Sequence, residues 1–299
     1  VSGLIACESY FIYNFFIFNK KSELGSGKIK ILIAAGIYPP DIGGPATYAV
    51  FLKAELLKLG CEVKIITFGR ENNIDFKENV IYVSRENNIL GRYFNFFRQV
   101  LRFSGWADTI YTLDLMSAGL PSVLAATMKG KKIVFRTGGD FLWEKAYQSE
   151  WTDLPLTKYY PAKKKIQEKI LLSLCRWLLA RIDIIIFSTE LQAKIYRQYY
   201  KLPEDKIRFI ANAMPEMKAV LPNTAYCDAI IFAGRLIKLK NLERLISAFL
   251  KAKENNSRLV IFGEGPAREN LQNLLHKLDQ DRRVELKGNV RHEELISFI

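Results

Sequence analysis

The sequence predicts an α/β protein made of two doubly wound domains, each built on a parallel sheet. Short apolar runs alternate with amphipathic segments of helical period along most of the chain. A glycine follows several of these runs, as is typical of strand-to-helix turns. The 299 residues, 49% of them hydrophobic, exceed the usual size of one core and can fill two. This composition excludes a disordered, collagen-like or disulfide-scaffold protein.

The first domain is expected over residues 28–213. Its first apolar run, 28–36, shows no polar alternation and is therefore predicted to be a strand buried on both faces. An amphipathic segment from Tyr48 follows and ends at Gly60, and run 61–69 predicts a second, parallel strand. Further strands are expected at 80–84, 109–113, 132–136, 182–187 and 207–210, with helices at 90–104, 117–128, 161–180 and 189–200.

A proline-containing linker, 214–226, separates this domain from a second one at 227–299. Strands are expected there at 229–234, 258–265 and 283–290, with helices at 242–252 and 267–279. Three strands are few for a sheet covered on both faces, and the chain ends within an amphipathic segment without a stop signal. We therefore expect the sequence to be a fragment.

Residues 1–27 are interpreted as a disordered or non-native leader followed by a linker. Their apolar run, 4–18, is interrupted by Glu8 and Asn14 and is shorter than the ~20 residues of a membrane span. No positive residue precedes it, which argues against a signal peptide. A weak membrane anchor is the alternative interpretation.

The chain is strongly basic, with 44 Lys and Arg against 31 Asp and Glu and a net charge of +13. Such a field favours anionic partners: nucleic acid, anionic membranes or phosphorylated small molecules. Basic and acidic residues are interspersed and no nucleic-acid-reading motif is present, so no nucleic-acid partner is expected. The four cysteines, Cys7, Cys61, Cys175 and Cys227, form no CxxC pair, which favours reduced, buried thiols in a cytoplasmic protein without structural zinc.

Three glycine-containing turns are candidate binding sites. Gly43 and Gly44 precede the first helix, where a ligand can approach the backbone and free amides attract anions. Gly234 ends a strand and is followed by Arg235 and Lys240, two cations that can neutralise a diphosphate near a helix start. A third turn contains Gly263, Glu264 and Gly265. An ordinary turn and a solvated basic loop are the alternatives, and the absence of GxGxxG indicates no dinucleotide cofactor.

In their order along the chain, the segments IGGPATY, GRLIKLKNLERLISAF, LVIFGEGPARENLQ and RVELKGNVRHEEL resemble the GT-B glycosyltransferases of family 4. The resemblance covers residues 28–299 and is most specific over 229–295. It implies two Rossmann-like domains facing a cleft, with the acceptor bound by the first and a nucleotide-sugar donor by the second. It also implies transfer of the sugar with retention of configuration and without a metal ion.

By this resemblance, Arg235 and Lys240 bind the leaving diphosphate, and Gly43 and Gly44 lie at the reaction centre. Preorganised cations suit this chemistry because negative charge develops on the phosphate oxygen as the sugar leaves. The one DxD sequence, Asp279-Gln280-Asp281, is interpreted as a surface turn. We therefore expect neither a metal nor any other cofactor.

The family usually carries a histidine on a loop of its first domain, but this chain has only His276 and His292, both in the second. Asp140 is the proposed substitute, in a loop with Arg136 and Gly139; a helix cap is the equally favoured alternative. Ser188, Glu190 and Asn212 match polar turns of the family, as cleft residues or as caps. The family's Glu-x7-Glu motif falls beyond Ile299, so we expect this polypeptide alone to be inactive.

The acceptor is expected to be a glycan or a lipid-linked molecule. The segment 90–104 combines three arginines with aromatic residues, which suits contact with an anionic membrane; a packed core helix is the alternative. The basic run 163–165 adds to that surface or is an exposed helix start. Competing functions are a nucleic-acid-binding protein, a phosphorylase or sugar-nucleotide epimerase on a similar scaffold, and a non-catalytic sugar-nucleotide binder.

Overall fold

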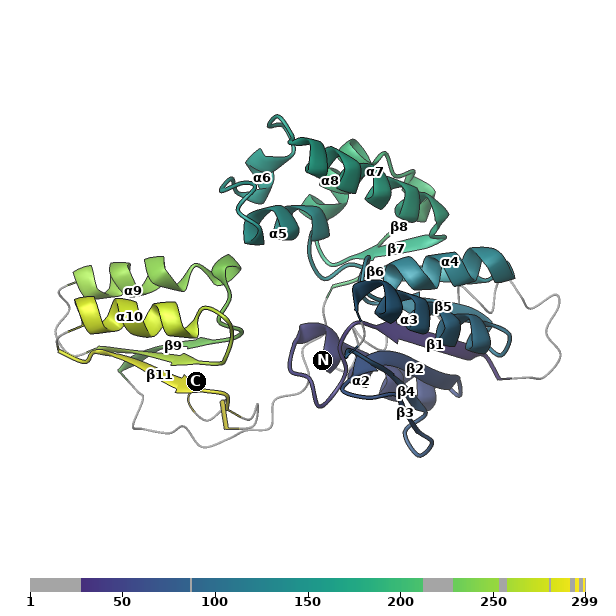
Figure 1. The fold of residues 1–299 in the computed structure, drawn as a ribbon, viewed down its shortest axis with the longest axis horizontal. Coiled ribbons are helices and arrows are strands. Elements are labelled where there is room, and N and C mark those ends of the chain that lie inside the picture. Colours follow the sequence, from purple (N-terminus) through teal and green to yellow (C-terminus); the bar gives the residue numbers. More distant parts are fainter. Residues whose placement is uncertain are drawn as a thin grey trace. The chain divides into compact units, whose positions relative to one another are not determined.

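A computed structural model describes residues 28–86, 88–211, 228–252, 257–279 and 281–290, together with 294, 295 and 298. The chain divides into two compact units, Val1–Pro215 and Glu216–Ile299 (Figure 1). The expected leader at 1–27 and linker at 214–226 lie outside the described residues. The predicted α/β class with doubly wound parallel sheets is confirmed.

Unit 1 is built on an eight-stranded sheet with the order β3-β4-β2-β1-β5-β6-β7-β8. Every neighbouring pair is parallel except β3 with β4. From β4 to β7 the order is that of a doubly wound nucleotide-binding sheet. The strands are β1 (Lys30–Ala35), β2 (Glu62–Gly69), β3 (Asn73–Asp75), β4 (Val80–Ser84), β5 (Thr109–Thr112), β6 (Lys132–Arg136), β7 (Ile184–Phe187) and β8 (Ile207–Phe209).

Helices cover both faces of this sheet (Figure 1). Along β1, Ile31 and Ile33 belong to one apolar cluster, which contains Leu52 and Leu56 of α2, and Leu32 belongs to the other, which contains side chains of α3, α4, α7 and α8. This accounts for the uninterrupted apolar run in β1. The helices are α2 (Gly44–Lys58), α3 (Ile89–Ser104), α4 (Gly119–Lys129), α5 (Phe141–Gln148), α6 (Leu156–Tyr159), α7 (Ile166–Arg181) and α8 (Glu190–Tyr200).

The structure corrects several sequence-based boundaries. The short edge strand β3 was not predicted, because it has only three residues, two of them polar, and pairs antiparallel to β4. The helix expected over 161–180 begins only at Ile166, since the Glu168 side chain accepts a hydrogen bond from the Lys165 amide at 2.7 Å and caps the helix there. The helices α5 and α6 were also missed.

Unit 2 contains a three-stranded parallel sheet, ordered β11-β10-β9. Its elements are β9 (Ala229–Ala233), the 3-10 helix η3 (Lys238–Lys240), α9 (Leu242–Lys251), β10 (Arg258–Phe262), α10 (Arg268–Leu278) and β11 (Val284–Gly288). The two α-helices lie on one face of the strands (Figure 1). Ile246 and Phe249 of α9 and Leu271 of α10 form a core there with Leu259 and Ile261 of β10.

Candidate functional site

The strand order of unit 1 reverses its direction at the carboxyl ends of β1 and β5. From β1 the chain moves to β2 on one side, and it later returns to β5 on the other side. Ligands of doubly wound sheets bind outside the strand ends where the order reverses in this way. Gly36 directly follows β1, and Asp114 follows β5 by two residues. This edge is called the switch-point edge below.

The turn with Gly43 and Gly44 lies beside this edge and opens α2. Gly43 is the N-cap and Gly44 the first helical residue, so the helix begins earlier than the sequence indicated. No side chain caps the amides of the first turn, and a Cβ at Gly44 would meet nothing within 4 Å. Uncapped amides at a helix start attract anions, so this turn can attract an anion, as its sequence predicts.

Asp114, which the sequence analysis did not single out, organises the opposite side of the switch point. Its Oδ1 accepts a hydrogen bond from the Ala118 amide at 2.9 Å, just before α4 begins. A Cβ at Gly36 would lie 2.8 Å from Asp114 Oδ2, so only glycine fits beside this carboxylate. Burial raises the pKa of Asp114, and hydrogen bonds from backbone amides oppose the rise. In the sequence, Asp114 stands out only as a carboxylate directly after an apolar run. Its position beside Gly36 follows from the strand order, which the sequence alone does not give.

Arg85, also missed, fixes the loop between β1 and α2. Its guanidinium forms an ion pair with Asp41 and lies 3.4 Å from the carbonyl oxygens of Gly36 and Phe68. These two carbonyls belong to the ends of β1 and β2. Arg85 therefore holds the loop that leads to Gly43 against the switch-point edge.

Arg136 ends β6 and is almost fully buried. Its guanidinium lies over the ring of Tyr48, 4.6 Å from the ring centre, and donates to the Ile210 carbonyl at 3.1 Å. Tyr48 belongs to the first turns of α2, so the structure brings Arg136 next to the helix that Gly43 and Gly44 open. The two predicted groups, far apart in sequence, share one edge of the sheet.

Asp140 caps α5, the alternative that the sequence left open. Its Oδ1 accepts from the Trp143 amide at 2.8 Å, and the Tyr160 hydroxyl lies 2.8 and 2.7 Å from its two carboxylate oxygens. That hydroxyl lies 2.6 Å from the hydroxyl of Tyr200. Only 3% of Asp140 is exposed, and burial raises its pKa against the hydrogen bonds that lower it. Its contact with the transferred sugar stays a prediction.

Three more of the predicted residues, Gly139, Ser188 and Glu190, lie along the same edge. Gly139 packs against the Glu144 carboxylate, and a Cβ there would collide with it. Ser188 is half-buried after β7, and Glu190 is the exposed first residue of α8. The cap of α8 is Thr189, whose hydroxyl accepts from the Gln192 amide at 3.4 Å. Asn212 lies outside the described residues.

In unit 2, two glycine turns pack directly against each other at the ends of β9 and β10. A Cβ at Gly263 would collide with the Gly234 carbonyl, and one at Gly265 would collide with that of Leu236. Hydrogen bonds join the turns, from the Gly234 amide to the Phe262 carbonyl at 3.0 Å and from the Leu236 amide to the Glu264 carbonyl at 2.9 Å. The glycines are needed because the two backbones touch.

Arg235 and Lys240 lie on the loop between β9 and α9, and both are exposed. Lys240 ends η3, and Asn241, with a φ of +53°, turns the chain into α9 without a side-chain cap. The ion pairs formed within the described ranges engage neither cation. Glu264, by contrast, pairs with Arg268 at 3.0 Å. The loop thus offers two cations without a carboxylate partner beside an uncapped helix start.

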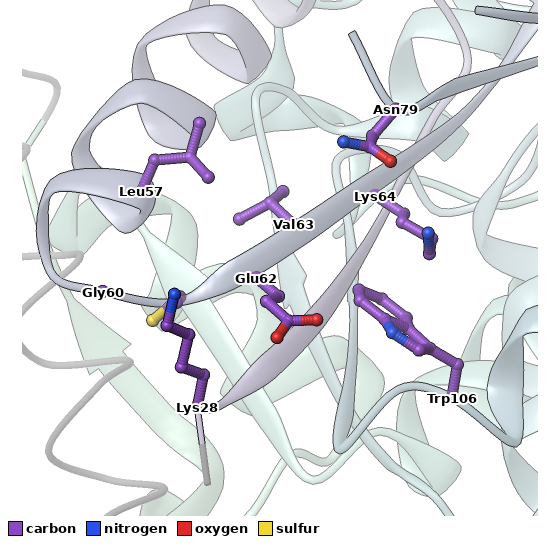
Figure 2. Close-up of a pocket in the computed structure, with 9 residues that line it drawn as sticks. Lys28, Leu57, Gly60, Glu62, Val63, Lys64, Asn79 and Trp106 are labelled. Atoms are coloured by element: carbon purple, nitrogen blue, oxygen red, sulfur yellow. The ribbon is translucent and has the colours of Figure 1, made fainter. Parts of the chain in front are cut away.

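A cavity of about 460 Å³ lies elsewhere in unit 1 (Figure 2). Its lining includes Gly60, Cys61 and Glu62, where α2 leads into β2, and Trp106, over which the Lys64 ammonium lies at 4.8 Å. This is the amino end of β2, opposite the switch-point edge. Burial raises the pKa of Cys61 to about 11, so its thiol stays protonated at neutral pH.

Two features are absent from the described part of the chain. It contains no group of three or more His, Cys, Asp or Glu side chains placed to hold a metal ion. None of its helices combines the length and apolar character needed to cross a membrane. The expectation of a reaction without metal stays a prediction.

The fold and these glycine turns define a two-domain glycosyltransferase of the GT-B type. The profile of Glycosyltransferase Family 4 matches residues 42–215, and that of Glycosyl transferases group 1 matches residues 217–299. The chain belongs to this family of glycosyltransferases. The resemblance inferred from the glycine and cation pattern is confirmed.

Individual proteins of known sequence match this chain at low identity and over part of their length. An uncharacterized glycosyltransferase of Methanocaldococcus jannaschii is 28% identical over 147 residues, which are 45% of this chain and 36% of that protein. The match thus spans about a third of that curated relative's length.

Two solved structures illustrate the shared fold. One is an Anabaena protein in complex with UDP and glucose, with a TM-score of 0.64, 14% identity and coverage of 88% of this chain and 70% of that one. The other is a UDP-GlcNAc 2-epimerase from Methanocaldococcus jannaschii, with a TM-score of 0.52, 13% identity and coverage of 90% and 76%. At these identities the likeness extends to the fold alone.

Proposed function

We propose that this chain binds a nucleotide-sugar and that the full-length protein transfers its sugar, with retention of configuration and without a metal ion, to a hydroxyl group of a glycan or lipid-linked acceptor. The proposal includes a role in making cell-surface polysaccharide or glycolipid, at a cytoplasmic location. The observation that carries it is the loop of Arg235 and Lys240: two exposed cations without a carboxylate partner in the described ranges, at the uncapped start of α9.

The chemistry follows from where charge develops. When the bond between the sugar and the diphosphate breaks, the electron pair goes to the phosphate oxygen. Arg235 and Lys240 stabilise that negative charge, and the first amides of α9 add to the effect. The touching turns at Gly234 and Gly263 fix the backbone that carries Arg235, so the cation is positioned before the reaction begins.

The acceptor side is assigned to the switch-point edge of unit 1. The uncapped amides after Gly43 and Gly44 and the buried Arg136 present positive charge there. We assign Asp140 a positioning role, because its carboxylate caps α5 and contacts Tyr160.

The test is substitution of the two cations. In the complete product of the gene, Arg235→Ala and Lys240→Ala are expected to lower kcat about a hundredfold or more each, since both stabilise charge in the transition state. UDP binding to the 299-residue chain, measured by calorimetry, is expected to weaken in parallel. Lys251→Ala, an exposed lysine at the far end of α9, is the control and should leave both unchanged. Near-normal kinetics in both variants would eliminate this diphosphate site.

A sugar-nucleotide epimerase is the second candidate, because a solved epimerase shares the fold. The two activities differ in their need for an acceptor. Release of free nucleotide together with an epimerised sugar, without an acceptor, would favour the epimerase over the transferase.

A further inference from the structure

The cavity at the amino end of β2, called the β2 cavity below, is separate from the site described above. Its volume of about 460 Å³ lies within the range of roughly 300–1,000 Å³ that is typical of pockets for small molecules (Figure 2). The eight residues of β2 span about 25 Å, and the switch-point edge lies at the other end of this strand's sheet. A ligand in the β2 cavity therefore cannot take part in the transfer step itself.

Two charged side chains of β2 line the β2 cavity. Glu62 and Lys64 alternate along the strand, so they lie on one face of it, the face that carries Ile66 and Phe68 further along. Those two apolar residues are buried, whereas Glu62 and Lys64 are half-buried. β2 is an internal strand, between β1 and β4, and internal strands of parallel sheets are usually apolar throughout. The charges thus interrupt the apolar pattern at the cavity.

The charged side chains of the β2 cavity are not used by neighbouring protein groups. In the part of the chain that the structure describes, no ion pair or hydrogen bond engages the side chains of Lys28, Glu62 or Lys64. The Lys64 ammonium lies over Trp106, 4.8 Å from the ring centre, and Glu62 extends toward Trp106 from the strand (Figure 2). The cavity therefore offers an unused carboxylate acceptor together with unused ammonium donors, beside a half-buried indole.

This lining selects one class of ligand. An anion would be repelled by Glu62, and a cation would be repelled by Lys28 and Lys64. An apolar ligand would remove water from all three charges without replacing it. A hydroxyl group both donates and accepts hydrogen bonds, so a neutral ligand with many hydroxyl groups can satisfy the carboxylate and the ammonium groups together. A pyranose sugar has these hydroxyl groups, and its C–H groups can pack on the negative face of an aromatic ring.

We propose that the β2 cavity is a second carbohydrate-binding site, which holds a sugar unit of a neutral glycan. Glu62 accepts hydrogen bonds from the sugar hydroxyl groups, Lys28 and Lys64 donate to them, and Trp106 contacts the ring. The binding itself does not depend on transfer. Its use rests on the proposed function: a glycan held here and at the switch-point edge must span about 25 Å, and binding at two points favours such a long acceptor over a short one.

The experiment is calorimetric titration of the full chain with neutral oligosaccharides. The probes are maltohexaose, cellohexaose and mannohexaose, and at least one of them is expected to bind. Its affinity should be nearly independent of salt, because the ligand carries no charge. Absence of binding by all three would overturn the proposal.

Two variants of the β2 cavity locate the bound oligosaccharide. Glu62→Gln keeps the size of the side chain and should weaken binding about tenfold, because hydrogen bonds to a charged acceptor are the stronger ones. Trp106→Phe still fills the half-buried position and should weaken binding about threefold or more, through loss of the indole N–H and of ring area. Trp177→Phe is the matched control, because Trp177 of α7 also has a cation over its ring, Arg181 at 3.9 Å, but does not line the cavity. It should bind as the unaltered chain does.

The direction of the Glu62→Gln effect identifies the class of ligand. Binding of inorganic phosphate that Glu62→Gln strengthens and salt weakens, without oligosaccharide binding, would assign the cavity to an anion and overturn the proposal. Oligosaccharide binding that Glu62→Gln and Trp106→Phe leave unchanged would place the glycan elsewhere and also overturn it. Arg235→Ala tests the transfer site alone and should bind the oligosaccharide normally, so failure of the proposed function and failure of this site are distinguished.

Discussion

Asp140 shows how one carboxylate can serve structure at a site where the family resemblance suggested chemistry. Its side chain ends a loop from β6, starts α5 and contacts Tyr160, which lies twenty residues further along the chain. Burial raises the pKa of Asp140, so its carboxyl group stays protonated to a higher pH in the folded protein than in the unfolded chain. The ionised form therefore costs stability, and the cost grows as the pH rises through the raised pKa.

Two substitutions at Asp140 separate these effects. Asp140→Asn keeps a capping oxygen and removes the charge, so its free energy of unfolding should stay within about 1 kcal/mol of the unaltered chain at neutral pH. Relative to the unaltered chain, this variant should gain stability as the pH rises from acid to neutral. Asp140→Ala loses the cap and a partner of the Tyr160 hydroxyl and should cost about 2 kcal/mol or more.

Urea denaturation at acid and neutral pH measures both variants. Assay of Asp140→Asn in the gene's complete product then decides its role in transfer. As a positioning residue, it should leave kcat within about tenfold of normal, because the asparagine preserves the loop. A stable Asp140→Asn variant with a hundredfold or greater loss of kcat would instead support the sugar contact that the resemblance implies.

At the scale of elements, the close contact between the turns after β9 and β10 predicts the effect of substituting a glycine there. Gly263 has a φ of +133°, and a Cβ there would collide with the Gly234 backbone. Gly263→Ala should therefore destabilise unit 2 by about 3 kcal/mol and weaken UDP binding, because the loop with Arg235 must move.

Gly105→Ala is the matched control for this variant. Gly105 follows α3 with a φ of −63°, and a Cβ there would meet nothing within 4 Å. This variant should be neutral or slightly stabilising in urea denaturation. Equal stability of the two variants would show that the turns can separate without cost, and the preorganisation of Arg235 would then lose its basis.

Elements with strong apolar runs could be predicted from sequence, and contacts across the sheet could not. The expected strands at 80–84 and 132–136 coincide with β4 and β6, since each contains a continuous apolar run, 80–83 and 133–135. The three-residue β3, with a single apolar residue, Ile74, carries no such signal.

The same limit applies to the site. Gly43, Gly44, Arg235 and Lys240 stand out in local patterns, because a turn and a helix start are local features. Asp114 beside Gly36, and Arg85 paired with Asp41, depend on which strands are neighbours and on how a loop folds back. Strand order is a long-range property that one sequence without an alignment leaves open.

At the scale of the whole molecule, the two units have separate cores. The apolar clusters formed by the described residues fall entirely within one unit or the other: two in unit 1 and one in unit 2. Units with separate cores unfold as separate cooperative transitions unless a large interface couples them. We therefore expect calorimetry of the chain to show two transitions.

A nucleotide ligand tests this prediction and the donor site together. Under the proposed function the nucleotide of the donor binds only unit 2, so a nucleotide probe such as UDP should raise the temperature of one transition and leave the other in place. At a concentration one hundred times its Kd, the ligand adds about 2.7 kcal/mol to the stability of the unit that binds it. The double variant Arg235→Ala, Lys240→Ala should keep both transitions and lose the shift. A single transition that UDP moves as a whole would mean that the two units unfold together, because binding to unit 2 would then also stabilise unit 1.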